Sequence, residues 1–216
     1  MVLDLESGEK IYDCLGRHPT FYRFIRWSVC FGREHGFQKR ALRSLKIKRG
    51  ETVLDLGCGN GVNFPLLEEA VGATGKIIAL DYSSGMLDQA MITAAWNGWR
   101  NIKFIQADAA RVNLPDNSLD GAVCTFAFSA MPGEDAAIRR VAAALKPGAQ
   151  LVVLDAKAFT GLGRILNPVL GPIFKHTTNW NYKKDVIAMI RKHFNEVEVS
   201  EYNCGCNYIA VAKKNG

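Results

Sequence analysis

The chain has 216 residues, of which 48% are hydrophobic, and its formal net charge is +6. This length predicts one sizeable α/β domain with a small appendage and excludes two full domains. The N-terminus, MVLDLESGEK, is polar and acidic and does not resemble a secretory signal, and no stretch reaches the roughly 18 apolar residues of a membrane span. We therefore expect a cytoplasmic protein. The six cysteines are scattered without CxxC spacing, so we expect no metal site and no disulfide.

Basic residues gather in two segments of the chain. Residues 17–49 carry a net charge of +9 and residues 157–193 a net charge of +6, whereas residues 50–156 carry −5. Such a distribution indicates either a surface that meets an anionic partner or a solvated basic face without one.

The predicted elements begin with a helical arm, residues 1–49, in which aromatic and basic side chains alternate. The predicted domain, residues 50–216, follows it. Its first part alternates short buried strands with helices, which is typical of parallel sheets with crossover helices. The expected strands are 52–56, 76–81, 102–106, 121–126 and 150–155, and the helices between them are 62–70, 85–97 and 134–145, the last stopped by Lys146-Pro147-Gly148.

A long connection, residues 157–182, interrupts this alternation and is predicted to be a helical lid over the site. Its apolar residues recur at helical spacing, and Pro168 and Pro172 are expected to break it into short helical pieces. A helix over 183–193 and a hairpin of strands 197–202 and 208–212 complete the chain. The fold prediction is a Rossmann-like, doubly wound, mostly parallel seven-stranded sheet with ligands at the carboxyl ends of its strands.

The stretch VLDLGCGNG, residues 53–61, runs from the first strand into Gly57, Gly59 and Gly61. Glycines there let a turn pass close to a ligand, although they can also be turn chemistry alone. The stretch lacks the last glycine of G-x-G-x-x-G, which disfavours a pyrophosphate. Asp81 ends the second strand, where a carboxylate can accept both hydroxyls of a ribose or cap the next helix. A nucleoside without phosphates is the simplest ligand.

At these residues the sequence strongly resembles the class I S-adenosylmethionine-dependent methyltransferases. The resemblance covers about residues 50–156, through VLDLGCGNG, ALDYSSGML, QADAARVNLPDNSLDGAVCTF and LKPGAQLVVLD in that order. It implies that S-adenosylmethionine is the cofactor and S-adenosylhomocysteine its product.

The resemblance also implies a role for single residues. Asn60 stands where the family commonly has Thr or Ser, and Asn63 is a candidate to supply a polar contact in its place. The implied cofactor contacts are the backbone of Gly57, Gly59, Asn60 and Gly61 with the methionine part, Asp55 with its ammonium group, Asp81 with the ribose, Tyr82 and Met86 with the adenine faces, Asp108 and Ala109 with the adenine edge, and Thr125 and Phe126 at the border of the methyl-transfer site.

The cofactor's sulfonium already activates its methyl group, so the protein mainly has to align a nucleophile and exclude water. An amine acceptor needs a free lone pair, whereas a phenol or enol also needs a base. The candidate catalytic residues are Tyr12, Tyr22, His176 and Tyr182, each of which can equally be structural.

The arm and the connection at 157–182 both combine apolar or aromatic with basic side chains, as interfacial helices on anionic membranes do. The alternative is that the two segments simply pack on each other as a lid. In the core and at Tyr12-Asp13 the chain is similar to methyltransferases of the phosphatidylethanolamine N-methyltransferase and ubiquinone/menaquinone types. We therefore expect a lipid-like acceptor, with an amino-phospholipid head group ahead of an isoprenoid quinone, and a protein peripheral to the inner face of the membrane.

Other functions fit the same core. A soluble small-molecule N- or O-methyltransferase is the main alternative, and a non-catalytic cofactor-binding protein is a further one. A nucleic-acid methyltransferase is less favoured, because the arm's aromatic residues recur at helical spacing and are expected to be buried, and because no Asn-Pro-Pro-Tyr signature follows the fourth strand. The pattern makes no prediction about an oligomer.

Overall fold

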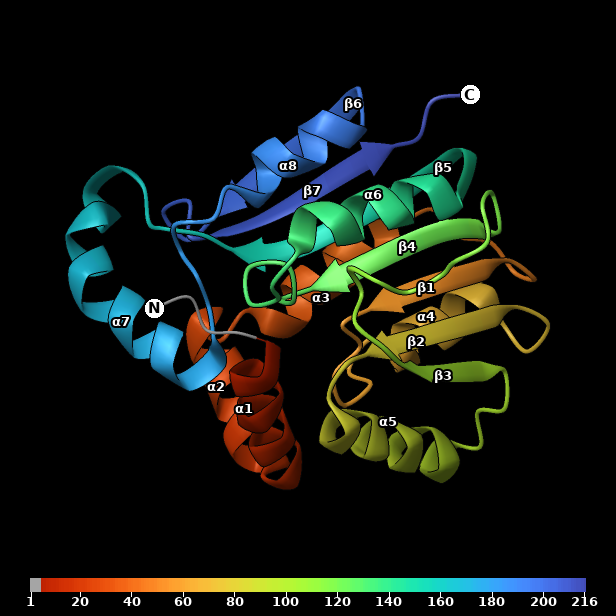
Figure 1. Cartoon of the computed structure of the whole chain (residues 1–216), viewed down its shortest axis with the longest axis horizontal. Helices are drawn as coiled ribbons and strands as arrows, with labels where there is room; N and C mark the ends of the chain where they lie inside the picture. The colour runs from red at the N-terminus through yellow and green to blue at the C-terminus, as the bar shows by residue number, and fades with distance from the viewer. Residues whose placement is uncertain (1–4) are drawn as a thin grey trace.

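Seven strands form one sheet in the computed structural model, which describes residues 5–216 (Figure 1). Their order is β3-β2-β1-β4-β5-β7-β6; β1 to β5 run parallel, and β7 lies antiparallel to both β5 and β6. This confirms the predicted mostly parallel sheet. The strands are β1 (Thr52–Leu56), β2 (Lys76–Asp81), β3 (Ile102–Gln106), β4 (Leu119–Thr125), β5 (Leu145–Ala156), β6 (Glu196–Tyr202) and β7 (Asn207–Lys213).

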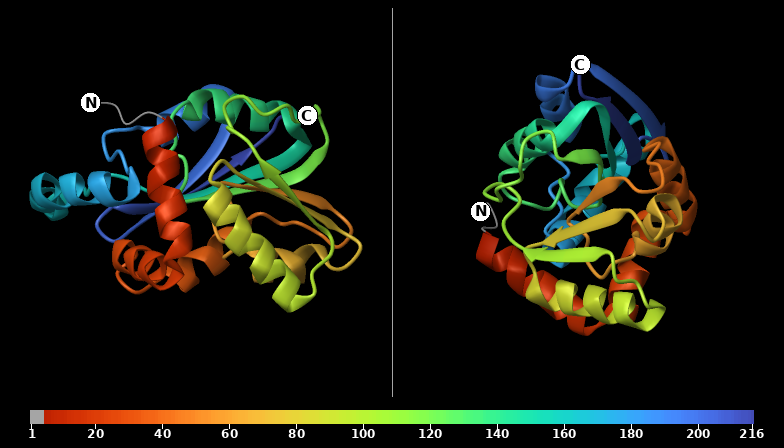
Figure 2. Two further views of the ribbon diagram at one scale, coloured as in Figure 1. Left: turned by 60° about the horizontal axis from the view of Figure 1, so that its bottom comes forward. Right: turned by 90° about the vertical axis from the view of Figure 1, so that its right-hand side faces the viewer.

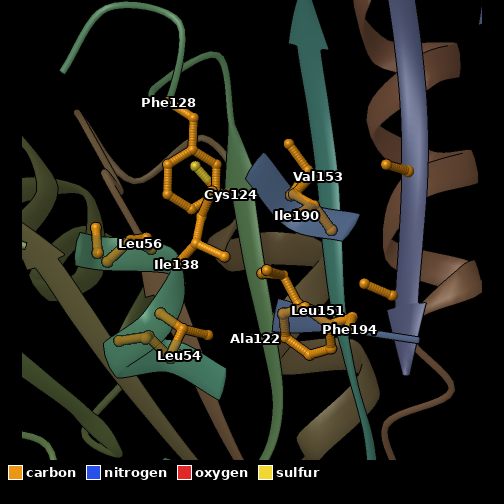
Figure 3. Packing of buried hydrophobic residues seen from close by; sticks show 14 of the residues in the cluster. Leu54, Leu56, Ala122, Cys124, Phe128, Ile138, Leu151, Val153, Ile190 and Phe194 are labelled. Carbon is orange, nitrogen blue, oxygen red and sulfur yellow. The ribbon is translucent and has the colours of Figure 1, made fainter. Parts of the chain in front are cut away.

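Helices cover both faces of the sheet (Figure 2). Successive residues of β1 serve opposite faces, as a strand requires: Leu54 and Leu56 pack with one group of buried side chains and Val53 with the other. The first group includes Ile138 and Ile190, which reach the sheet from the helices above it (Figure 3). One face carries α6 (Glu134–Ala144) and α8 (Val186–His193), and the other carries α3 (Glu34–Ser44), α4 (Phe64–Val71) and α5 (Ser84–Asn97).

Two predicted boundaries beside the site are wrong. The strand expected at 150–155 begins at Leu145, because Leu145 pairs with Leu119 and Gly148 N donates to Lys214 O at 2.9 Å. Lys146-Pro147-Gly148 therefore belongs to β5, and the helix before it ends at Ala144, within one residue of the predicted end. The strand expected at 121–126 ends at Thr125, since Phe126 has a φ of +55° that a strand does not allow.

The described arm contains three helices, of which α1 (Leu5–Arg17) lies against α5. Residues 1–4 of the predicted arm lie outside the described part of the chain. A Cβ on Gly16 would lie 2.7 Å from the carbonyl group of Gly85, so the two helices touch through glycine. Asp13 Oδ1 also accepts hydrogen bonds from Ser83 Oγ at 2.5 Å and from Gly85 N at 3.1 Å. These contacts fix α1 across the N-terminus of α5.

The second helix, α2 (Pro19–Val29), exposes most of its aromatic side chains. The expectation that the arm's aromatic residues are buried is wrong for four of them, whose exposed fractions lie between 54% and 60%. Ile25 and Arg26 on the same helix are buried instead. The exposed aromatic residues are Phe21, Phe24, Trp27 and Phe31.

The connection after β5 forms a 3₁₀ helix η1 (Gly161–Leu166) and the helix α7 (Asn167–Thr178), which projects beside α1 (Figures 1 and 2). Pro168 lies in the first turn of α7, where a proline is tolerated. The break expected at Pro172 is wrong: this proline is exposed within the helix, so the carbonyl group that it leaves unpaired can bind water. No helix among residues 5–216 is long and apolar enough to cross a membrane.

Candidate functional site

The loop after β1 brings backbone into the site. Gly57 has a φ of +66°, and a Cβ there would lie 2.4 Å from the Cβ of Ala127. Gly59 has a φ of +53°, and a Cβ there would face Tyr22 Oη at 3.7 Å. Gly61 serves helix packing instead, because its missing Cβ leaves room for Phe64. The loop is therefore fixed by glycine conformation and by close packing, as the motif predicts.

Asp81 holds this loop from the end of β2. Its Oδ2 accepts a hydrogen bond from Gly59 N at 2.8 Å, and its Oδ1 accepts one from Ser83 N at 3.0 Å. Burial raises the pKa of Asp81, and the bonds from Ser83 and Gly59 oppose that rise. A carboxylate has about four acceptor positions, so Asp81 can still accept the two hydroxyl groups of a ribose.

A cavity, the cofactor pocket, lies over this loop and spans about 420 Å³ of space not filled by protein atoms, part of it open to solvent. It adjoins a cleft of about 280 Å³ that contains Asp108 and Ala109. The structure thus brings together most of the predicted cofactor residues from the ends of β1, β2, β3 and β4. The cofactor pocket is lined by Tyr12, Tyr22, Gly57, Gly59, Asp81, Tyr82, Thr125, Phe126, Ala127, Ala130 and Met131.

Asp55 is fully buried beside the cofactor pocket, not in its wall. Its Oδ1 accepts a hydrogen bond from Asn63 Nδ2 at 2.9 Å, and the same amide donates to Thr125 Oγ1 at 3.0 Å. Its Oδ2 is buried and has no hydrogen-bond partner within residues 5–216. Burial raises the pKa of Asp55 to about 7. Asn63 thus holds Asp55 and Thr125 together, and its predicted polar contact in the cofactor site stays a prediction.

Two other predicted cofactor residues lie at the edges of this arrangement. Met86 is buried against Leu15 and Ile25 of the arm and lines neither the cofactor pocket nor the cleft beside it. Asn60 lines a more open cavity together with Arg26. Their contacts with adenine and methionine stay predictions.

A second cavity, the apolar pocket, encloses about 470 Å³ and shares Tyr12, Tyr22, Phe126 and Ala130 with the cofactor pocket. Its walls come from segments far apart in the sequence, namely α1, α2, the ends of β4 and β5, and α7. Nearly all of its lining is hydrophobic or aromatic. The residues are Tyr12, Tyr22, Ile25, Arg26, Val29, Phe126, Ser129, Ala130, Ala156, Phe174, Thr178 and Trp180.

Ser129 lines the apolar pocket, and its hydroxyl group is hydrogen-bonded to a buried carboxylate. Its Oγ donates to Asp155 Oδ1 at 2.6 Å, and its N donates to Asp155 Oδ2 at 2.9 Å. Ala156 N donates to Oδ1 at 2.8 Å. Burial nevertheless raises the pKa of Asp155 to about 6. Ser129 and Asp155 therefore form a pair that can accept a proton from a group in the pocket.

The predicted catalytic residues have different surroundings. Tyr12 and Tyr22 line both pockets, and Tyr12 Oη donates to Thr178 O at 2.9 Å. Burial raises the pKa of both tyrosines above its usual value, so each stays neutral and is a poor proton acceptor. Tyr182 packs against Trp180 and α7 and lines neither pocket. The side chain of His176 lies outside the described part of the structure.

The donor set fits the cofactor that the resemblance implies. Asp81 can bind the ribose, and the glycine loop leaves room for the methionine part to pass close to the backbone. The cleft at Asp108 can hold the adenine base. Two unpartnered buried groups of opposite charge, Asp55 Oδ2 and Arg26 Nη2, suit an amino acid with both of its charged ends.

Three site residues have no role in the sequence-based prediction. Asp155 is the penultimate residue of β5, close to the position at which Asp81 ends β2, and this similar position is a signal that could have identified it. Arg26 stands in a basic run and Ser129 in a loop, and nothing local distinguishes either of them from its neighbours.

Comparisons with known proteins agree with this geometry. A family model described as a methyltransferase domain matches residues 53–148. The chain is 31% identical over 159 residues to a demethylmenaquinone methyltransferase of Desulfitobacterium hafniense; the match covers 72% of this chain and 63% of that enzyme, less than two thirds of its length. It is 25% identical over 218 residues to the enzyme of the same name from Oceanobacillus iheyensis, with 91% of this chain and 92% of that enzyme covered.

A solved structure shares the fold. The S-adenosylmethionine-dependent methyltransferase from Aquifex aeolicus superposes with a TM-score of 0.58 at 22% identity, and the match covers 82% of this chain and 88% of that one. At this identity the likeness shows the fold alone.

Proposed function

Since the chain belongs to the class I S-adenosylmethionine-dependent methyltransferases, we propose that it methylates a lipid-like acceptor whose reacting part is a flat, hydroxylated ring, an isoprenoid quinol. The observation that carries this proposal is the apolar pocket, which adjoins the cofactor pocket through Tyr12, Tyr22 and Phe126. When bound, the cofactor supplies an electrophilic methyl group on a sulfonium sulfur. The pocket's residues hold the acceptor in line with it and keep water out.

The walls of the apolar pocket support a flat, apolar acceptor. Phe174 and Trp180 lie edge to face with 5.6 Å between their ring centroids, and Tyr12 and Tyr22 lie edge to face at 6.5 Å. An aromatic ring packs favourably on such walls. The demethylmenaquinone methyltransferases, named for a quinone acceptor, support the same class of molecule for this chain.

The pair formed by Ser129 and Asp155 is an argument for an acceptor that has a hydroxyl group on its ring. An acceptor hydroxyl can donate to Ser129 Oγ while Ser129 donates to Asp155 Oδ1, so that the acceptor's proton passes to Ser129 as the serine proton passes to Asp155. Loss of this proton raises the electron density of the ring, which makes its carbon or oxygen a better nucleophile. For methylation at carbon, the ring proton of that carbon leaves afterwards to restore the aromatic ring.

An amino-phospholipid, which the sequence alone favours, is the second candidate. The aromatic walls support it, because tyrosine, phenylalanine and tryptophan faces can hold a methylated ammonium group by cation–π interaction. It ranks second because an amine has no need of a proton acceptor behind a serine once it is bound as the free base.

Exposed apolar residues beside the apolar pocket support a membrane as the source of the acceptor. The pocket lies between α2, which contributes Tyr22 and Val29, and α7, which contributes Phe174 and Thr178. Exposed Arg23, Arg33 and Arg164 lie among these side chains, and basic residues among apolar ones favour an anionic bilayer surface. We define the apolar rim as Phe21, Phe24, Trp27, Phe31, Leu162, Ile165, Leu166, Val169 and Ile173, all of them exposed.

The test is a transfer assay with methyl-labelled S-adenosylmethionine and three defined acceptors. These are a chemically reduced isoprenoid naphthoquinone in anionic vesicles, phosphatidylethanolamine in the same vesicles, and a water-soluble naphthoquinol without the isoprenoid chain. We expect label in the vesicle-borne quinol at a higher kcat/KM than in the soluble one. The product is identified by extraction and mass spectrometry.

Each contrary result has a distinct meaning. Label in phosphatidylethanolamine alone would replace the proposal by the second candidate. Equal kcat/KM for the soluble and the vesicle-borne quinol would support a quinol ring as the acceptor and contradict the proposal that the acceptor comes from a membrane. No label in any of the three, with cofactor binding intact, would contradict a lipid-like acceptor of either kind.

A further inference from the structure

The loop after β4 is held by hydrogen bonds from the segment after α7. We define the β4 loop as residues 126–133 and the α7–α8 linker as residues 179–185. Three consecutive carbonyl groups of the β4 loop each accept a hydrogen bond from the linker. The donors and acceptors are Asn181 N with Ser129 O at 3.0 Å, Asn179 Nδ2 with Ala130 O at 2.8 Å, and Lys184 Nζ with Met131 O.

The β4 loop carries Ser129, which the proposed function uses. Ser129 N and Ser129 Oγ donate to the two carboxylate oxygens of Asp155 at 2.9 and 2.6 Å. Ala130, the next residue, lines both the cofactor pocket and the apolar pocket. The β4 loop therefore lies between the carboxylate of Asp155 and the α7–α8 linker, and the position of Ser129 Oγ depends on both contacts.

Asn179 is the linker residue whose buried side chain serves this loop. It is 7% exposed, and its Nδ2 reaches Ala130 O across 49 positions of the chain. A Cβ on Gly8 would lie 3.1 Å from the same Nδ2, so α1 packs closely against the amide. Asn179 lines neither pocket. Its effect on the pockets therefore passes through the β4 loop and not through a contact with a ligand.

The backbone of Asn179 supports the same role. Its φ is +56°, and it directly follows the last residue of α7. Glycine is the usual residue in a left-handed position after a helix, and asparagine is a less common one. Glycine would allow the turn but would supply no side chain, whereas asparagine allows the turn and also supplies a donor for Ala130 O. The donor is what asparagine adds at this position.

The other two donors of the linker are less specific. Asn181 uses its backbone N–H, which every residue except proline supplies. Lys184 Nζ also lies 3.1 Å from Glu134 Oε2, so this side chain connects the linker to the first turn of α6 as well. Asn179 is therefore the position at which a single substitution tests the contact between the linker and the β4 loop.

We propose that Asn179 is a positioning residue for methyl transfer. Through Ala130 O it holds the β4 loop, so that Ser129 Oγ remains hydrogen-bonded to Asp155 when an acceptor enters the apolar pocket. A displacement of about 1 Å can cost about 10²-fold in rate, so a loosened loop lowers turnover although every side chain that lines the pocket is still present. The effect on turnover rests on the proposed function, whereas the effect on the loop does not.

Amide hydrogen exchange of the full chain, followed by mass spectrometry, tests the loop without any ligand. Asn179→Gly removes the donor and keeps the left-handed backbone accessible. Loss of one hydrogen bond favours local opening by about 3- to 10-fold, so we expect exchange in the β4 loop to rise by that factor. Exchange in β1 and β2 should stay unchanged. Asn179→Asp keeps the shape of the side chain but replaces its donor by an oxygen, and it should raise exchange in the loop in the same way.

Steady-state kinetics test turnover with whichever of the three acceptors the wild type methylates. We expect Asn179→Gly to lower kcat by about 10- to 100-fold. KM for the acceptor and the dissociation constant of S-adenosylhomocysteine should stay within about threefold, because Asn179 lines neither pocket.

Asn203→Gly is the matched control. Asn203 also has a positive φ, +51°, and its amide donates to Cys30 O at 3.4 Å and to Asn207 Oδ1 at 2.7 Å. The substitution thus removes comparable hydrogen bonds at a comparable backbone position without touching the bonds of the β4 loop. It should leave both kcat and exchange in the β4 loop unchanged.

Unchanged exchange of the β4 loop in both Asn179 variants would overturn the proposal. So would a wild-type loop that exchanges as fast as an unstructured peptide, a result that needs no variant. Faster exchange with unchanged kcat would contradict the positioning role. Equal changes in kcat, KM and S-adenosylhomocysteine affinity, or equal effects of Asn203→Gly, would mean a general structural role. If the wild type methylates none of the three acceptors, the proposed function fails, and the exchange measurement alone decides whether Asn179 holds the loop.

Discussion

The cofactor pocket and the apolar pocket share a wall but are built differently. The floor of the cofactor pocket is made of backbone at strand ends, where Gly59 N and Ser83 N hold one carboxylate and a glycine at position 57 leaves room for Ala127. The apolar pocket is made of side chains from the arm, the ends of two strands and α7. The floor of the first is determined by local chain geometry, whereas the second exists only when distant segments meet.

This difference predicts where amino-acid substitutions are tolerated. A pocket made of backbone keeps its shape through the conformation of a few residues, so a single added methyl group disturbs it. A pocket made of side chains on separate helices can alter its lining residue by residue, which is how one core can serve different acceptors. Substitutions in the cofactor pocket and in the apolar pocket should therefore have different effects.

The largest effect is expected for Gly57→Ala. A side chain at a φ of +66° costs about 1–2 kcal/mol, and the clash with Ala127 Cβ adds to it, so we expect a loss of about 3 kcal/mol or more in the free energy of unfolding and no measurable S-adenosylhomocysteine binding. Gly148→Ala is the matched control: its φ is +78°, but a Cβ there meets no atom within 4 Å. Urea unfolding measures the free energy of unfolding of both variants, and calorimetry measures their binding of S-adenosylhomocysteine. Equal losses of stability in the two variants would contradict the close-packing argument.

On the apolar side, Asp155→Asn should reduce kcat by about 10²-fold or more and leave S-adenosylhomocysteine affinity within about twofold. Asp155 must be ionised to take a proton, so wild-type kcat/KM should rise with pH through about 6 and level off above it. The positive charge of Lys184 lowers the pKa of Asp155, whereas the nearby Cys124 and Tyr208 stay neutral because burial raises their pKa values.

The control for this variant is Asp120→Asn, which changes a carboxylate that accepts a hydrogen bond from Thr52 N at the start of β4. It should keep the pH profile of the wild type. Ser129→Ala should lose turnover as Asp155→Asn does. If kcat/KM of Asp155→Asn still rose with pH near 6, another group would be the proton acceptor.

A smaller effect concerns stability and pH. Burial raises the pKa of Asp55 from 3.8 to about 7, so the folded chain holds this proton more tightly than the unfolded chain does. Ionising Asp55 therefore removes stability as pH rises from about 4 to about 7. We expect Asp55→Asn to gain about 2 kcal/mol over the wild type between pH 5 and pH 8 while it weakens S-adenosylhomocysteine binding.

Urea unfolding at the two pH values measures this gain. In Asp120→Asn no such gain is expected, since the ion pair with Lys146 lowers the pKa of Asp120 below its usual value despite partial burial. A constant difference between Asp55→Asn and the wild type would mean that Asp55 is already ionised at pH 5.

The smallest effect is expected at the apolar rim. The double variant Leu162→Gln/Ile165→Gln changes side chains that are 94% and 80% exposed, so it should not alter folding. It should weaken binding to anionic vesicles by about tenfold, or about 1.4 kcal/mol, and leave turnover of a soluble quinol unchanged. Trp96→Gln is the control, because Trp96 is 89% exposed on α5, away from the rim. Equal vesicle binding by all three proteins would contradict the membrane surface.

The sequence predicts the cofactor side because its information is local. Gly57 follows β1 directly, Asp81 ends β2 and Asp108 lies two residues after β3, and parallel strands bring such positions together in any sheet of this order. The glycine loop and the ribose carboxylate could therefore be placed without knowing how any helix packs.

The apolar side could not be predicted in this way. Arg26 and Phe174 are 148 positions apart and share a pocket only because α1 and α2 fold back across the sheet toward α7. Solvent exposure was a second difficulty: Trp27 and Ile165 recur at helical spacing, as core residues do, and the pattern does not distinguish a buried stripe from an unpartnered one. Pro172 stays within a helix because its surroundings are water, which a local rule does not consider.

The contact between α1 and α5 has a consequence for the order of events in turnover. Gly16 meets Gly85, Asp13 accepts two hydrogen bonds there, and Tyr12 lines the cofactor pocket, so we expect a bound nucleoside to leave by separation of α1 from α5. Under the proposed function, the acceptor would reach its own pocket between α2 and α7. The two ligands would then use separate entrances, and the exchange of product for fresh cofactor would be a step with its own rate, in series with methyl transfer.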